Sequence, residues 1–147
     1  LFSSKISVTF LVKILIDTNV VIDLILEREP FVEEAVRLFQ KIEQGNLEGY
    51  IAATTITNIF YIIRKIEGCA VALEAIKQLL SGLRLCSVDR QTIETALSFD
   101  LIDFEDGIQL ACATLSQLDG IVTRDRQDFL NSPLPVYSPT ELLNQLQ

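Results

Sequence analysis

Three aspartates lie where short apolar runs end or a helix begins: Asp17, Asp106 and Asp125. Asp17 directly follows the run KILI, Asp125 lies two residues beyond the run IVT, and Asp106 falls in the first turn of a predicted helix. If the runs are parallel strands, these positions come to one edge of a sheet. Carboxylates gathered there repel each other unless a cation lies among them. Oxygen ligands favour hard cations, so the sequence predicts a Mg²⁺ or Mn²⁺ site.

The chain contains no histidine. This excludes Ser-His-Asp and Cys-His catalysis, histidine general bases and histidine metal ligands. A divalent cation held by carboxylates can instead lower the pKa of a bound water and stabilise charge on a phosphate oxygen. Two such ions about 4 Å apart can bind both the attacking and the leaving oxygen. Phosphodiester hydrolysis therefore remains open to this chain.

The bulk composition fits one globular domain. The chain has 147 residues, 49% of them hydrophobic, and a net charge of -8. The acidic excess disfavours a general nucleic-acid coat, but it leaves room for an enzyme that binds nucleic acid through a local patch. The three cysteines (Cys69, Cys86 and Cys112) are widely spaced, which favours buried thiols in a reducing, cytoplasmic compartment.

Short apolar runs alternate with amphipathic stretches along the chain. We expect strands at 13–16, 50–53, 83–87, 121–123 and 134–137. We expect helices at 31–43, 54–66, 70–80, 90–99, 104–118 and 139–146, with Thr54 or Thr55 capping the second of them. This alternation predicts a three-layer α/β/α domain with a mainly parallel sheet of about five strands. We expect residues 12–147 to form it, residues 1–11 to be an N-terminal extension, and no segment to span a membrane.

Four segments resemble, in order, the motifs of PIN domains, in particular the VapC-like toxins of prokaryotic toxin–antitoxin pairs. They are ILIDTNVVIDL (14–24), IAATTITNIFY (51–61), DFEDGIQLACA (103–113) and GIVTRDRQDF (120–129). The resemblance implies a PIN-like fold and a Mg²⁺- or Mn²⁺-dependent endoribonuclease. It also implies an RNA substrate, a cognate antitoxin protein and a homodimer.

The resemblance also assigns residues. Asp17, Asp106 and Asp125 match the metal-binding aspartates of the first, third and fourth motifs. Asn19 would brace the site by hydrogen bonds, and Thr123 matches a hydroxyl often found before the last acid.

The second motif departs from the family pattern. It usually carries a glutamate where this chain has Asn58, which brings no charge and cannot act as a base. We expect another acid to compensate. Asp103 is the first candidate, because it lies three residues before Asp106 and so near the same helix face, and Asp128 is the second.

The candidates for phosphate contacts are the basic residues Arg64, Lys65, Arg124 and Arg126. The last two flank the aspartate of the fourth motif, so they can steer a polynucleotide toward the metal. Asp23 lies six residues past Asp17, in an apolar stretch (20–26) that we also expect to be helical, and we expect its side chain to face solvent.

Two other functions compete with a ribonuclease. The first is a PIN-like binding or regulatory module that has lost catalysis, which Asn58 favours. The second is a flavodoxin-like receiver domain, which also gathers acids at strand ends. A receiver domain needs adjacent acids early in the chain and a lysine after a late strand. Residue 18 is threonine and the late strand is followed by Arg124, so this function ranks last.

Overall fold

The structure is a computed structural model that describes residues 11–147. The expected N-terminal extension, residues 1–11, therefore lies outside the described residues except for Leu11, and the domain boundary at residue 12 stays a prediction. No helix in the described part of the chain is long and apolar enough to cross a membrane.

A five-stranded parallel sheet forms the centre of the fold, in the order β3-β2-β1-β4-β5. The strands are β1 (Lys13–Ile16), β2 (Glu48–Ala52), β3 (Arg84–Cys86), β4 (Gly120–Val122) and β5 (Val136–Tyr137). The central strand β1 is apolar and fully buried from Ile14 to Ile16, as expected for a strand covered on both faces. The predicted mainly parallel sheet is confirmed.

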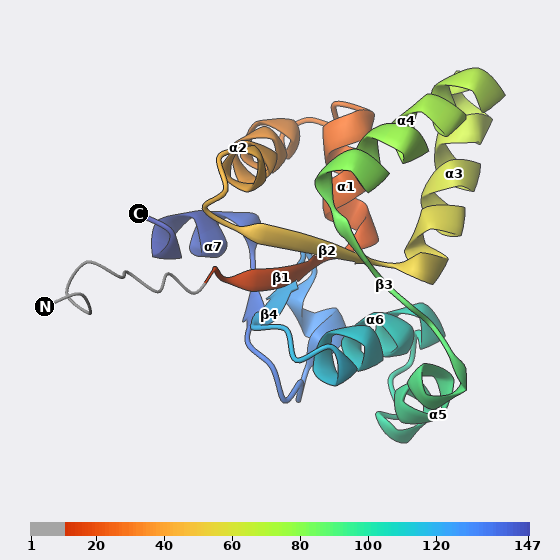
Figure 1. The fold of residues 1–147 in the computed structure, drawn as a ribbon, viewed down its shortest axis with the longest axis vertical. Coiled ribbons are helices and arrows are strands. Elements are labelled where there is room, and N and C mark those ends of the chain that lie inside the picture. The colour runs from red at the N-terminus through yellow and green to blue at the C-terminus, as the bar shows by residue number, and fades with distance from the viewer. Residues whose placement is uncertain (1–10) are drawn as a thin grey trace, which may run out of the picture.

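Helices cover both faces of the sheet (Figure 1). They are α1 (Thr18–Ile25), α2 (Val32–Glu43), α3 (Ala53–Glu67), α4 (Cys69–Gly82), α5 (Arg90–Ser98), α6 (Phe104–Leu115) and α7 (Pro139–Gln145), with a short 3-10 helix η2 (Arg126–Phe129). One apolar core joins the sheet to α1–α4 and α7, and a second joins it to α5, α6 and η2. The result is the predicted three-layer α/β/α architecture.

Several elements differ in their bounds from the predicted ones, and two of the differences concern the ends of helices. The helix α3 begins at Ala53 directly after β2, so neither Thr54 nor Thr55 is its cap, and Thr55 is instead fully buried. The helix α6 ends at Leu115 rather than at residue 118, because Gln117 turns into the left-handed region with φ 55. The chain then places Leu118 in the core beneath β4.

The carboxyl ends of the strands meet at one edge, which is where α1, α3 and η2 are connected. The backbone N–H of Asp17, just beyond β1, donates to the carbonyl of Val122 at the end of β4 (3.0 Å). The residues that follow these two strands are therefore held side by side.

We predict that Gly120→Ala destabilises the fold. A methyl group there would lie 2.8 Å from the carbonyl oxygen of Pro135 and 3.0 Å from the ring of Tyr137, which would force β4 and β5 apart. The free energy of unfolding should fall by about 1–3 kcal/mol, measured by urea denaturation. Gly82→Ala is the matched control, because nothing lies within 4 Å of its added methyl group. Equal stability of the two variants would contradict the prediction.

Candidate active site

The carboxylate of Asp17, directly after β1, is buried, with 5% of the residue exposed. Its Oδ1 accepts hydrogen bonds from the backbone N–H of Thr18 (2.7 Å) and from Nε2 of Gln109 (2.8 Å), and its Oδ2 accepts one from Oγ1 of Thr123 (2.7 Å). Burial raises the pKa of Asp17, and these hydrogen bonds oppose the rise. Each oxygen has two lone pairs, so the position left for another ligand is on Oδ2.

Gln109 was missed by the sequence analysis. It lies on α6, is 1% exposed, and donates to Asp17 through its amide nitrogen. Its other amide atom, Oε1, is buried and has no hydrogen-bond partner among residues 11–147. A glutamine inside the apolar run GIQLACA is the signal that could have found it, because a buried polar side chain needs a specific partner.

Asp106 lies in the first turn of α6 and is half-buried. Its carboxylate accepts no hydrogen bond from any residue that the structure describes. Burial and the charges of Asp103, Asp17, Asp128 and Glu105, in that order, raise the pKa of Asp106 to about 7. The five acids are thus close enough for their charges to oppose one another.

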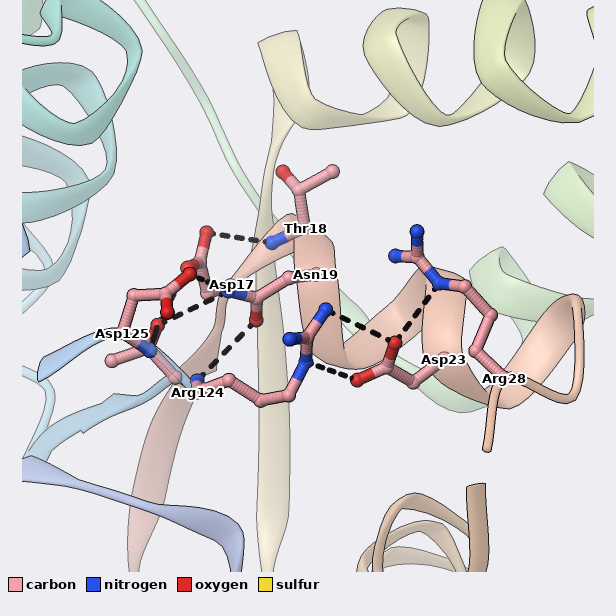
Figure 2. Close-up of polar contacts among 8 residues, drawn as sticks. Asp17, Thr18, Asn19, Asp23, Arg28, Arg124 and Asp125 are labelled. Atoms are coloured by element: carbon pink, nitrogen blue, oxygen red, sulfur yellow. Dashed lines mark hydrogen bonds and ion pairs between the residues drawn. The ribbon is translucent and has the colours of Figure 1, made fainter. Parts of the chain in front are cut away.

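Asp125 follows β4 and is joined to Asp17 through two other side chains (Figure 2). Nδ2 of Asn19 donates to Oδ2 of Asp125 (3.2 Å), and the backbone N–H of Asp125 donates to Oγ1 of Thr123 (3.0 Å). The Thr123 hydroxyl in turn donates to Asp17. These bonds bring the aspartates of the first and fourth motifs to the same place, with Asn19 and Thr123 between them.

The two acids expected to compensate for Asn58 lie at the rim of this edge. Asp103 is exposed and caps α6, because its Oδ1 accepts from the backbone N–H of Asp106 (3.2 Å). Asp128 lies in η2 and is also exposed, and slight burial followed by the charges of Asp125 and Asp103 raises its pKa. Together with Asp106 they border a cleft that apolar side chains complete: Leu101, Leu110 and Leu130 among others.

Three predicted residues lie on α3, the helix that follows β2. Asn58 is half-buried, and its side chain makes no hydrogen bond with another described residue. Arg64 and Lys65 are exposed in the last turn of the helix. The helix begins at the strand-end edge and rises 1.5 Å per residue, so these two cations lie about 16 Å along its axis from that edge.

The expectation that Asp23 faces solvent is wrong. Asp23 is 1% exposed and lies between two arginines (Figure 2). Its Oδ2 accepts from Nε of Arg124 (2.6 Å), and its Oδ1 accepts from Nη2 of Arg124 (3.3 Å) and from Nε of Arg28 (3.0 Å). Asp23 is one helical turn after Asn19, so α1 holds the turn after β4 at two successive points.

The arginines that flank Asp125 are both ion-paired. Besides its bonds to Asp23, Arg124 lies over the ring of Phe31, with its guanidinium carbon 3.9 Å from the ring centroid. Arg126 pairs with Glu141 at 3.2 Å on the surface. Arg124 therefore fastens the loop between α1 and α2 to the turn after β4, and its contact with phosphate stays a prediction.

The donor chemistry of this edge fits a hard divalent cation. Only oxygen ligands are present, and the Asp106 carboxylate has no hydrogen-bond partner within residues 11–147. Four other acids raise its pKa, which a cation would reverse. In the same part of the chain, no group of three or more acidic or cysteine side chains converges closely enough to hold a metal ion as placed. Carboxylates therefore gather at this edge without forming a complete coordination shell.

The sequence matches one family model, described as the PIN domain, over residues 13–127. This span includes all four motifs except the last two residues of the fourth. No curated protein matches the chain.

Several solved structures share the fold. A toxin–antitoxin complex from Klebsiella pneumoniae is 25% identical, with a TM-score of 0.65 over 85% of this chain and 96% of that chain. DNA-bound VapBC from Salmonella typhimurium is 17% identical, with a TM-score of 0.67 over 88% and 99%. VapC20 from Mycobacterium tuberculosis, described as a sarcin–ricin loop cleaving toxin, is 15% identical, with a TM-score of 0.62 over 74% and 86%.

We predict a pH-dependent stabilisation by Asp106→Asn in the absence of divalent cations. The pKa of Asp106 rises from an ordinary 3.8 to about 7 on folding, so the folded protein binds more protons between these values. The stability contributed by this group therefore falls as pH rises from about 4 to about 7, and the loss persists above pH 7. In urea denaturation with EDTA, the variant should be more stable than the wild type at pH 8 and equal to it near pH 4. A difference that does not change with pH would contradict the raised pKa.

We also predict that Arg124→Ala destabilises the fold strongly. Of the partners that the structure describes, the variant leaves the buried Asp23 carboxylate only Arg28, so the free energy of unfolding should fall by about 3 kcal/mol in urea denaturation. Arg37→Ala is the control, since its pair with Glu33 is exposed and should contribute no more than about 0.5 kcal/mol. A loss in Arg124→Ala as small as in the control would show that the buried pair does not hold the loop.

Proposed function

This chain belongs to the PIN-domain family, and on that premise we propose that it is a Mg²⁺- or Mn²⁺-dependent endoribonuclease. The observation that carries the proposal is the half-buried carboxylate of Asp106. It lies among four other acids and accepts no hydrogen bond from the described residues, and its pKa is about 7. A carboxylate in these surroundings gains more from a bound cation than from water or from its present neighbours.

We propose that Asp17, Asp106 and Asp125 hold the cation. Asp17 would bind through Oδ2, because both lone pairs of its Oδ1 are already used by hydrogen bonds. Asp125 has Oδ1 available, because Asn19 donates to its Oδ2. A divalent cation held by these groups would supply positive charge to the phosphate and lower the pKa of water.

The remaining side chains orient these ligands. Thr123 and Gln109 direct the Asp17 carboxylate, and Asn19 directs that of Asp125. Ligands whose hydrogen bonds are already formed need little rearrangement when the cation binds. Burial of Asp17 also keeps water from its oxygens, which strengthens its attraction to a cation.

We propose RNA as the substrate and a small antitoxin protein as the partner. Support comes from the similar structures, which include a toxin–antitoxin complex and a toxin described as cleaving the sarcin–ricin loop. The chain would then be the toxin component of such a pair. The three free cysteines fit the reducing, cytoplasmic compartment in which that RNA would be met.

A homodimer is part of the same proposal. Apolar side chains that are at least half exposed lie on α3 and α4: Tyr61, Ile66, Leu73 and Leu80. Apolar side chains exposed on two neighbouring helices favour burial in a protein–protein interface.

The proposal is tested by Mn²⁺-dependent cleavage of RNA. Asp106→Asn is the variant of choice, because Asp106 is half-buried and accepts no hydrogen bond from the described residues, so the fold should survive. We expect the rate of cleavage to fall by about 100-fold or more, while Glu94→Gln, an exposed acid on α5, leaves it unchanged. A wild-type protein that neither binds Mn²⁺ nor cleaves RNA at any Mn²⁺ concentration would overturn the proposal. It would leave a PIN-like binding or regulatory module.

A further inference from the structure

A single threonine joins two carboxylates at the strand-end edge. The backbone N–H of Thr18 donates to Oδ1 of Asp17 (2.7 Å), and its hydroxyl donates to Oε1 of Glu105 (2.9 Å). These two acids are 88 positions apart in the chain, yet the backbone and the side chain of Thr18 bind one each. Glu105 therefore lies beside the carboxylate of Asp17.

The helical periodicity of α6 explains why Glu105 points toward Asp17. Glu105 and Gln109 are four residues apart and so lie one turn apart on the same face of the helix. Gln109 contacts Asp17 directly. Glu105 thus faces the same carboxylate, and its charge contributes to raising the pKa of both Asp17 and Asp106.

An unpartnered oxygen marks the same place. Oε1 of Gln109 is buried and accepts no hydrogen bond within residues 11–147, although the amide nitrogen of this side chain is bound to Asp17. Buried acceptors in folded proteins are almost always satisfied, by protein atoms, water or an ion. An acceptor of this kind, on the side chain that also contacts Asp17, is open to a cation or its water ligands.

We propose that Glu105 is a ligand of the divalent cation and supplies the acidic group that the second motif lacks at Asn58. This inference rests on the proposed function and names a ligand that the motifs do not. It replaces the expectation that Asp103 or Asp128 compensates. Asp103 uses one oxygen to cap α6, and both residues are exposed at the rim, whereas Glu105 is half-buried against Thr18.

An acid at position 105 can chemically replace an acid at position 58. A glutamate at residue 58 would reach the site from α3, on the face of the sheet that carries α1. Glu105 reaches it from α6, on the opposite face. The carboxylate type is the same, so the hard-cation preference of the site is kept while the side of approach changes.

The test measures Mn²⁺ affinity directly, by titration with electron paramagnetic resonance of the free ion, in the wild type and in three variants that each remove one nearby charge. We expect Glu105→Gln to weaken Mn²⁺ binding at least tenfold. Asp103→Asn and Asp128→Asn should each weaken it by less than threefold, because both carboxylates are exposed and solvent screens their charges. Glu94→Gln, on the exposed face of α5, is the matched control and should leave the affinity unchanged.

Two results would overturn the inference in different ways. If the wild type binds Mn²⁺ and Glu105→Gln binds it within twofold, or if all three nearby variants weaken binding equally, Glu105 is not a ligand and the proposed function stands. If the wild type does not bind Mn²⁺, the proposed metal dependence fails, and the assignment of Glu105 fails with it.

Discussion

The buried carboxylate of Asp17 is the constraint on which the rest of this edge depends. A charge with so little solvent is tolerated only when hydrogen bonds replace the water that it has lost. Three donors do so, and they come from α1, from α6 on the other face of the sheet, and from the residue after β4. The geometry of three separate elements is thereby tied to the position of one side chain.

This requirement explains why the polar residues around Asp17 lie where they do. Thr123 is fully buried, and its hydroxyl also accepts from the backbone of Asp125, so the bond that satisfies Asp17 also positions the next acid along. Gln109 donates to Asp17 from the opposite side, and its own carbonyl oxygen has no hydrogen-bond partner among residues 11–147. The satisfied groups orient the site, while the unsatisfied oxygen and the repelling acids make it receptive to a cation.

Asp23, nearby on α1, is also a buried acid, but different groups compensate its charge. Its buried charge is met by two guanidinium groups rather than by neutral donors, and one of them also lies over Phe31. A buried ion pair adds little net free energy of folding, because both partners lose their hydration. It nevertheless fixes the position of the loop that carries one of the partners. Its consequence here is that the turn carrying Asp125 is attached to α1 and to the loop that follows α1.

Much of the fold could be predicted because its signals are local. Short apolar runs separated by amphipathic stretches determine parallel strands and covering helices, and an acid directly after a strand falls at the strand-end edge whatever the details. The positions of residues 17, 106 and 125 at this edge could therefore be predicted from the sequence, and the family could be predicted from the motifs. What only the tertiary structure decided is which polar side chains meet there. The hydrogen bonds of Gln109, Glu105 and Arg124 to residues of the first motif join positions 87 to 101 apart, and no local pattern carries such information. Asp23 and Arg124 illustrate the reason. In the sequence, each is predicted to be a surface charge. Asp23 can be buried only because the fold brings Arg124 next to it.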